Sequence, residues 1–251
     1  MKRLFILFPF ILMLSFQSFA TSLYGNERTV IKLSVKETID GKKSPYHISQ
    51  YILLQFFYLH GFDVISVQKT LYDKKMNKTL KKNGEKDFAT WQKELKKKKP
   101  LFIIEGKAKA TLYNTSTFYE STVAFIYNIN IELKLKNASG KVLATFKDSL
   151  KYGASNRGRH PKLRAAKGGL KNLAFAFCGP LYKNPHLNPL FQCDRSKLEA
   201  RLKAIEKHIN YLKEKNRQME KKNSKENPKK NPPKKETTPP KKDDNSGGGP
   251  F

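Results

Sequence analysis

The chain has 251 residues, with 50 Lys and Arg against 21 Asp and Glu, and a formal net charge of +29. This length suits one domain with extra segments, and the charge favours polyanionic partners and disfavours basic ones. About +18 of the charge lies in residues 21–194 and about +9 in residues 195–251, so the basic character is not confined to the C-terminal end. A general lysine bias in composition is the alternative explanation, because Lys far outnumbers Arg.

Residues 1–20 have the pattern of a secretory signal peptide. Lys2 and Arg3 precede an apolar run from Leu4 to Phe16, and small residues at Ser18 and Ala20 mark a peptidase site. The run is shorter than the ~20 residues that cross a bilayer, although a retained membrane anchor is the alternative. We expect an exported protein, periplasmic or secreted, with no membrane span after cleavage.

Residues 21–194 have the element pattern of one folded domain. Alternating Ile31, Leu33 and Val35 predict a strand at 29–36, and Ser44-Pro45 and Gly61 bound a helix. The remaining predicted elements are a strand at 61–67, a basic helical region at 69–99, strands at 101–112, 121–135 and 142–150, and a helix from Pro161. The order β-α-β-α-β-β-β-α predicts an α+β fold with a mixed, largely antiparallel sheet and helices on one face. The first two strands are expected to pair through a right-handed crossover.

Two cysteines, Cys178 and Cys193, suggest a covalent link in an exported protein. An even pair in an oxidising compartment predicts a disulfide, which would close a proline-containing loop. In the chain-entropy model a loop of about 16 residues stabilises the fold by roughly 3 kcal/mol.

The strongest local candidate for a binding site lies at the start of the last helix. Bases cluster there without acids, where free helix N–H groups favour an anion. The predicted anion-binding residues are Arg157, Arg159, Lys162, Arg164, Lys167 and Lys171. The alternative is a plain solvated helix face.

No catalytic constellation is apparent in the sequence. The hydrolase, metalloprotease and nucleotide-binding motifs that we searched for are absent, and the histidines lack ligand spacing. Glu105 and Glu132 form a conceivable carboxylate pair, but we interpret them as solvent-face strand residues among Lys107, Lys109 and Lys134. We therefore expect neither enzymatic activity nor a metal or cofactor, with an enzyme of unrecognised class as the alternative.

Residues 195–222 predict an amphipathic helix. Its apolar positions recur at alternating intervals of four and three residues, the pattern of a coiled-coil seam. The seam residues are Leu198, Leu202, Ile205, Ile209, Leu212, Asn216 and Met219. A parallel homodimer through residues 196–222 and a single helix that folds back on the domain are both compatible with this pattern. Residues 223–251, rich in Lys and Pro, are predicted to be a disordered cationic tail.

Several segments together resemble small envelope domains. They are Trp91 to Leu95, Phe102 to Gly106, Tyr127 to Leu135, Ser139 to Leu143, and Leu163 to Ala166 followed by Gly179. In this layout the chain resembles the amino-terminal domain of the translocation protein TolB and the curli-secretion and penicillin-binding-protein-activator lipoproteins. The resemblance implies an envelope setting and a binding or assembly role, although no propeller and no lipid-accepting cysteine follow the pattern.

The favoured function is therefore an exported, non-enzymatic accessory factor. Its partner is expected to be an envelope protein or an anionic cell-envelope polymer. The alternative is an exported nucleic-acid-binding protein, which would need aromatic side chains beside the bases; Phe118 and Tyr119 are the candidates.

Overall fold

The computed structural model describes residues 28–67, 73–118, 122–155 and 159–226. By their contacts, residues up to Glu214 form one compact unit, and residues from Lys215 onward form a second. The predicted signal peptide at 1–20 and the predicted disordered tail beyond residue 226 lie outside the described residues. The sheet and the helices that cover it all belong to the first unit.

The described strands form one mixed sheet. The strands are β1 (Thr29–Ile39), β2 (Lys42–Lys43), β3 (Phe62–Ser66), β4 (Phe102–Phe118), β5 (Thr122–Asn137) and β6 (Val142–Ser155). Their order is β2-β1-β4-β5-β6, with β3 also paired to β1. β1 pairs in parallel with β3 and β4, and the other neighbouring strands are antiparallel. The predicted α+β class and the pairing of the first two strands are confirmed.

Strand alternation decides which face of the sheet is buried. Ile31, Leu33 and Val35 of β1 are fully buried, and every second residue of β5 from Tyr127 to Leu135 is buried as well. β4 and β6 run beyond the predicted strand ends at 112 and 150. In β4, polar residues continue the pairing with β5 after a register shift between Leu112 and Asn114. Backbone hydrogen bonds between the strands do not require alternating apolar side chains.

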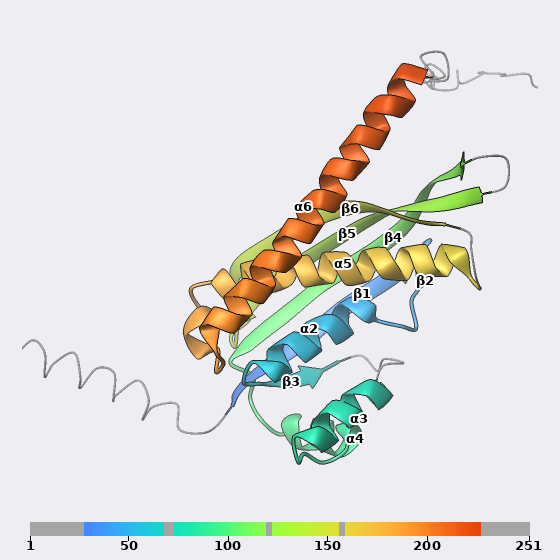
Figure 1. Ribbon diagram of the computed structural model, residues 1–251. Helices are drawn as coiled ribbons and strands as arrows, with labels where there is room; N and C mark the ends of the chain where they lie inside the picture. Colours follow the sequence, from blue (N-terminus) through green and yellow to red (C-terminus); the bar gives the residue numbers. More distant parts are fainter. Residues whose placement is uncertain (1–27, 68–72, 119–121, 156–158, 227–251) are drawn as a thin grey trace, which may run out of the picture. The chain divides into compact units, whose positions relative to one another are not determined.

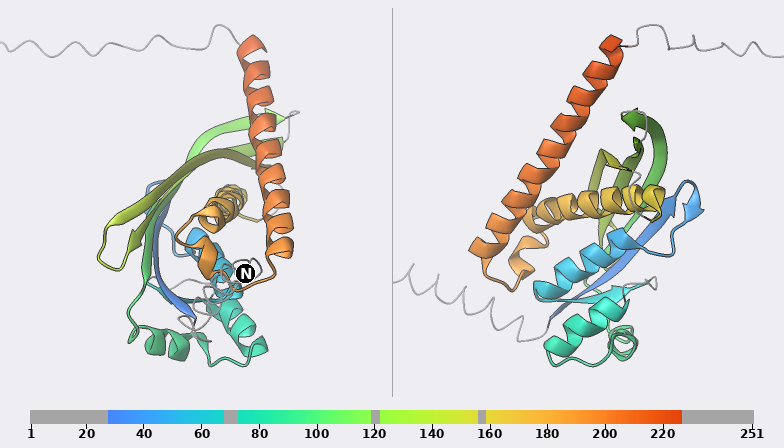
Figure 2. Two further views of the ribbon diagram at one scale, coloured as in Figure 1. Left: turned by 90° about the vertical axis from the view of Figure 1, so that its left-hand side faces the viewer. Right: turned by 45° about the vertical axis from the view of Figure 1, so that its right-hand side comes forward.

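Two helices pack on the apolar face of the sheet, α2 (Ile48–Leu59) and α5 (Pro161–Lys183), and the first part of α6 (Arg195–Glu226) lies against these helices (Figure 1). α5 approaches the sheet closely, since a Cβ on Gly169 would lie 2.5 Å from a carbon of Ile129. A short 3-10 helix, η1 (Asn188–Leu190), joins α5 to α6. The opposite face of the sheet carries none of the described helices (Figure 2).

The basic region at 69–99 contains two helices instead of one. α3 (Asp73–Lys82) ends before Gly84, whose φ of 72° lies in the left-handed region. α4 (Phe88–Leu95) starts at Asp87, whose side chain accepts hydrogen bonds from two backbone N–H groups. This turn and the new N-cap break the helical run, and α4 then packs against β3.

Side-chain amides satisfy backbone groups that lack a strand partner. Gln50 accepts a hydrogen bond from Val35 N–H at 2.9 Å. Gln92 accepts one from Ser66 N–H at 2.8 Å and donates to the carbonyl of Val64 at 2.7 Å. Gln92 thereby covers the outer edge of β3, which lowers its tendency to pair with another strand.

The first part of α6 folds back on the domain. Leu198 and Leu202 belong to the core, Ile209 is buried, and Ile205 and Leu212 pack against the core from its rim. Of the two arrangements that the seam pattern allowed, the structure therefore shows the intramolecular one over 198–212. A homodimer through residues 196–222 stays a prediction. Asn216 lies in the second unit, and the side chain of Met219 is outside the described part.

Candidate anion-binding surface

The helix-free face of the sheet is a lysine-rich surface, which we call the open face. It consists of the strand residues that alternate with the buried ones on β1, β4, β5 and β6. Its charged residues are Lys32, Lys36, Glu105, Lys107, Lys109, Glu132, Lys134, Lys136, Lys147 and Lys151. Eight lysines thus stand against two glutamates among the described residues of this face.

Strand register brings these lysines together across the sheet. Lys36 of β1 lies directly opposite Lys107 of β4, which in turn lies opposite Glu132 of β5. Two like charges directly opposite each other are unfavourable in an antiparallel sheet, and the same Coulomb repulsion acts on neighbouring strands here. An anion bound between the two ammonium groups would relieve this repulsion.

The two glutamates neutralise only part of this charge. Glu105 pairs with Lys136, and Glu132 lies 3.5 Å from the ammonium of Lys147. Within the described residues, no carboxylate pairs with the five other lysines of β1, β4 and β5, which are Lys32, Lys36, Lys107, Lys109 and Lys134. A hollow of about 220 Å³ lies among them, lined by Lys36, Lys107, Lys134 and both glutamates.

Only part of the predicted anion site at the start of α5 lies within the described residues. Arg157 lies outside the described residues, and Arg159 and Arg164 are exposed. The ammonium of Lys162 lies over the ring of Phe125 at 5.4 Å, whereas Lys167 lies over Tyr46 at 3.1 Å and Lys171 over Phe175 at 5.9 Å. The three lysines therefore diverge from one another, each toward an aromatic ring. Anion binding at this helix start stays a prediction.

The predicted disulfide is wrong for this structure, because Cys178 and Cys193 are both free thiols. The side chain of Cys178 is buried on α5, where its S–H donates to the carbonyl of Ala174 at 3.7 Å. Cys193 lies after η1 and is only partly buried. The helical fold of α5 and η1 holds this loop by its own hydrogen bonds, including Asn188 N–H to the carbonyl of Asn184 at 2.8 Å.

The other sites that the sequence raised have simple structural settings. In the described ranges, no three His, Cys, Asp or Glu side chains converge as metal ligands would. None of the helices in those ranges combines the length and the apolarity that crossing a membrane requires. Of the two candidate stacking aromatics, Tyr119 and the side chain of Phe118 lie outside the described part.

The helical side of the sheet holds a groove that the sequence did not predict. It has a volume of about 830 Å³ and lies between α5, α6 and Asp148 of β6. Lys213 closes one end with a two-oxygen contact to Asp148, with both distances at 2.7 Å. At another point Tyr182 donates to Glu199 at 2.8 Å. Within the groove, Lys213 and Asp148 thus neutralise each other, and Glu199 has a hydrogen-bond donor in Tyr182.

Sequence reasoning found three of the open-face lysines but missed the surface as a whole. Lys107, Lys109 and Lys134 were expected to face solvent, which their exposure confirms. Lys32, Lys36, Lys136, Lys147 and Lys151 escaped notice, although Lys32 and Lys36 each lie between two buried residues. The alternation of exposed and buried residues predicts which side chains of one strand share a face. It does not predict the strand order that brings the lysines side by side, because that order depends on long-range pairing.

No family model matches the chain, and neither does any curated protein. Similar solved structures include a neuraminyllactose-binding hemagglutinin homolog from Helicobacter pylori, with 10% identity, a TM-score of 0.41, and 66% of this chain and 91% of that chain covered. A lipoprotein from Neisseria meningitidis has 17% identity and a TM-score of 0.28, with 62% of this chain and 99% of that chain covered. The C-terminal domain of LpoB from Salmonella enterica has 12% identity and a TM-score of 0.26, with 53% and 93% covered.

These neighbours include envelope lipoproteins of the type that the sequence resembles, LpoB being a penicillin-binding-protein activator. At such low identities and TM-scores, no residue role, ligand or partner carries over to this chain. Its function has to be argued from its own surface.

Proposed function

We propose that this chain is an exported, non-enzymatic protein of the cell envelope that binds an anionic polymer through the open face of its sheet. The observation that carries the proposal is the set of five lysines without a carboxylate partner on a helix-free face. Export would follow removal of residues 1–20, which leaves Thr21 as the first residue.

The chemistry of the open face favours a flexible polymer over a single shaped ligand. Its cations are all lysines, which act as mobile point charges and lack the planar fork with which arginine recognises carboxylate or phosphate. Spread over four strands, such charges suit repeated contacts along a polyanion. The carboxylate-bearing cell-wall polymer peptidoglycan is the occupant that fits an exported protein.

Nucleic acid is the less favoured occupant. Sequence-tolerant binding of single strands requires aromatic rings on which bases stack. On the described open face, Tyr113 is the large exposed aromatic side chain, and the ammonium of Lys151 already lies over its ring at 4.0 Å. The open face thus offers charge without a free stacking platform.

Co-sedimentation with purified peptidoglycan over a salt series tests the proposal. The double variant Lys36→Gln/Lys107→Gln removes the two lysines that oppose each other across β1 and β4. We expect its binding to fall several-fold and to depend less steeply on salt than that of the unmodified protein. Lys81→Gln/Lys82→Gln on α3 removes the same charge from exposed positions outside the open face, and we expect it to bind normally.

Competition with DNA distinguishes the two polymers. Retention on peptidoglycan in the presence of excess DNA supports the proposal. Complete displacement by DNA would favour the nucleic-acid alternative. Equal losses in the two double variants would mean that binding follows net charge alone, and the partner would then have to be sought among envelope proteins.

A further inference from the structure

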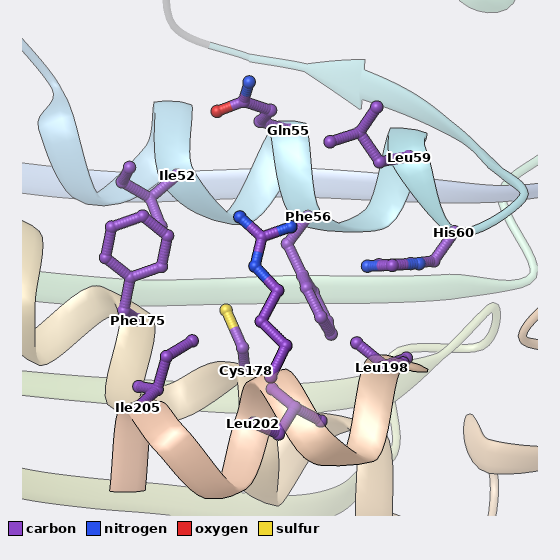
Figure 3. Close-up of a pocket in the computed structure, with 11 residues that line it drawn as sticks. Ile52, Gln55, Phe56, Leu59, His60, Phe175, Cys178, Leu198, Leu202 and Ile205 are labelled. Carbon is purple, nitrogen blue, oxygen red and sulfur yellow. The ribbon is translucent and has the colours of Figure 1, made fainter. Parts of the chain in front are cut away.

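A small cavity between α2, α5 and α6 combines apolar walls with polar side chains from all three helices, including Gln55, Cys178 and Arg201. Its volume is about 70 Å³, and its apolar lining includes Phe56, Leu59, Leu198 and Ile205. Figure 3 shows the ring of His60 and the Sγ of Cys178 directed toward the middle of this space. Arg201 of α6 lines the same cavity.

The imidazole of His60 lines this cavity, and one of its ring nitrogens lacks a hydrogen-bond partner. Its Nδ1 is buried and has no hydrogen-bond partner. Such an atom is uncommon in folded proteins, because a buried polar group without a partner loses its hydration and gains nothing in return. The ring itself is held in place by Phe56, with centroids 5.1 Å apart, and by Phe191 at 6.2 Å.

Arg201 supplies a positive charge that no described carboxylate neutralises. No acidic side chain lines the cavity. Arg201 affects the pKa of both neighbouring groups. Burial lowers the pKa of His60, and the Arg201 cation lowers it further. Burial raises the pKa of Cys178 to about 12, and the Arg201 cation opposes this increase. A protonated, neutral thiol of this kind is a poor nucleophile.

We propose that this cavity binds a short aliphatic carboxylate, with its carboxylate between Arg201 and His60 and its hydrocarbon part against the apolar walls. The anion supplies the missing partner of the imidazole and the missing counter-charge of the guanidinium. A cavity of ~150 Å³ takes up the six carbons of benzene in an engineered protein, so about 70 Å³ has room for a hydrocarbon part of two or three carbons. A phosphate dianion fits less well, because its two charges would be costly to desolvate against apolar walls.

Protonation couples to binding with a definite sign. An anion beside His60 favours the imidazolium, so the bound state takes up a proton that the empty cavity holds weakly. The affinity for the carboxylate therefore rises as the pH falls from about 8 to about 6. The His60→Gln variant keeps a hydrogen-bonding side chain that cannot titrate. Its affinity for the carboxylate should therefore be the same at about pH 8 and at about pH 6.

Titration of the purified protein with propionate, followed by the NMR signals of the His60 ring, tests the inference. We expect a saturable shift that sodium chloride at equal ionic strength does not produce. Arg201→Gln should weaken binding by roughly tenfold or more, because a charge-assisted contact is lost. Lys207→Gln, an exposed charge change on the same helix, should bind like the unmodified protein.

The inference is overturned if propionate gives no saturable shift, if chloride gives the same shift, or if Arg201→Gln binds as tightly as the unmodified protein. Because Arg201 is exposed over more than a third of its surface, its substitution leaves the fold intact. None of these outcomes depends on polymer binding by the open face, which lies on the other side of the sheet.

Discussion

At the scale of single residues, Glu37 is the most consequential charge in the core. Its carboxylate is fully buried and accepts hydrogen bonds from the Ser44 hydroxyl at 2.7 Å, the Ser49 N–H at 2.9 Å and the Ser49 hydroxyl at 3.1 Å. The Ser49 N–H belongs to the first turn of α2, where backbone donors lack an intrahelical partner. Glu37 therefore caps α2 from a neighbouring strand.

Glu37→Ala should destabilise the protein by about 3 kcal/mol, since three buried donors lose their acceptor. Urea denaturation measures the change in the free energy of unfolding. Glu206→Ala, which removes an exposed carboxylate from α6, should change that free energy by less than about 0.5 kcal/mol. A loss for Glu37→Ala no larger than that of this control would contradict the capping role.

Two histidines flank α2 and make its packing sensitive to pH. Burial lowers the pKa of His47, where Lys43 also lowers it and Glu37 raises it. Burial and the Arg201 cation lower the pKa of His60. The unfolded chain therefore binds protons more readily than the folded one, and stability falls as the pH drops below about 6.5.

Comparing the urea midpoint at about pH 7.5 and about pH 5.5 measures this dependence. The double variant His47→Asn/His60→Gln should lose less stability between these two values than the unmodified protein. Asparagine suits position 47, where φ is 45° and the backbone is left-handed. An unchanged pH dependence in the double variant would show that other groups cause it.

At the scale of elements, α6 shows how one apolar pattern serves two structures. The four-three spacing from Leu198 to Leu212 fits a coiled-coil seam and equally fits a helix on a protein core. What decides between them is an apolar surface on the same chain, here provided by α5 with residues such as Phe175. The intramolecular partner is always within reach, whereas a second chain must be recruited at an entropic cost.

Leu202→Ala should lower the free energy of unfolding by about 2 kcal/mol or more, because the side chain is buried to 7% exposure. The unfolding midpoint should not depend on protein concentration, as it would if this seam joined two chains. Lys207→Ala, on the exposed side of the same helix, is the matched control and should be nearly neutral. A concentration-dependent midpoint would restore the dimer interpretation.

At the scale of the whole molecule, the open face and the C-terminal segment are two separate lysine-rich regions that could each contact a polymer. Residues 227–251 contain Lys-Lys pairs separated by prolines and two adjacent aspartates. If the open face is the polymer site, removing residues 227–251 should leave most of the binding to peptidoglycan intact. Cutting after Glu226 keeps α6 whole, which a cut before Arg195 would not.

The truncated and full-length proteins should therefore sediment with peptidoglycan at similar salt concentrations. The salt dependence of the truncated protein should be slightly less steep, because fewer counterions are displaced. Loss of binding on truncation would assign the polymer contact to the C-terminal segment and leave the open face without a demonstrated partner.

The sequence by itself determined what depends on neighbouring residues. Alternation in β1 and β5, the end of α2 before Gly61 and the start of α5 at Pro161 were all predictable, because burial and capping leave local patterns. The start of α2 was predicted wrongly: the helix begins at Ile48, with His47 and not Ser44 at its N-cap. The split of the basic region into α3 and α4 was missed, although Gly84 and Asp87 carried the signal.

Only the tertiary structure decided what depends on distant residues. The lysines of β1 and β4 are about 70 positions apart and meet because parallel pairing sets their register. The cavity that His60 and Arg201 line exists because α6 packs beside α2. The two cysteines stay free because the folded helices, and not the spacing of the cysteines in the sequence, fix where each thiol lies. Long-range packing and strand register leave no mark within a short window of sequence, so the surface and the cavity appear only in the folded chain.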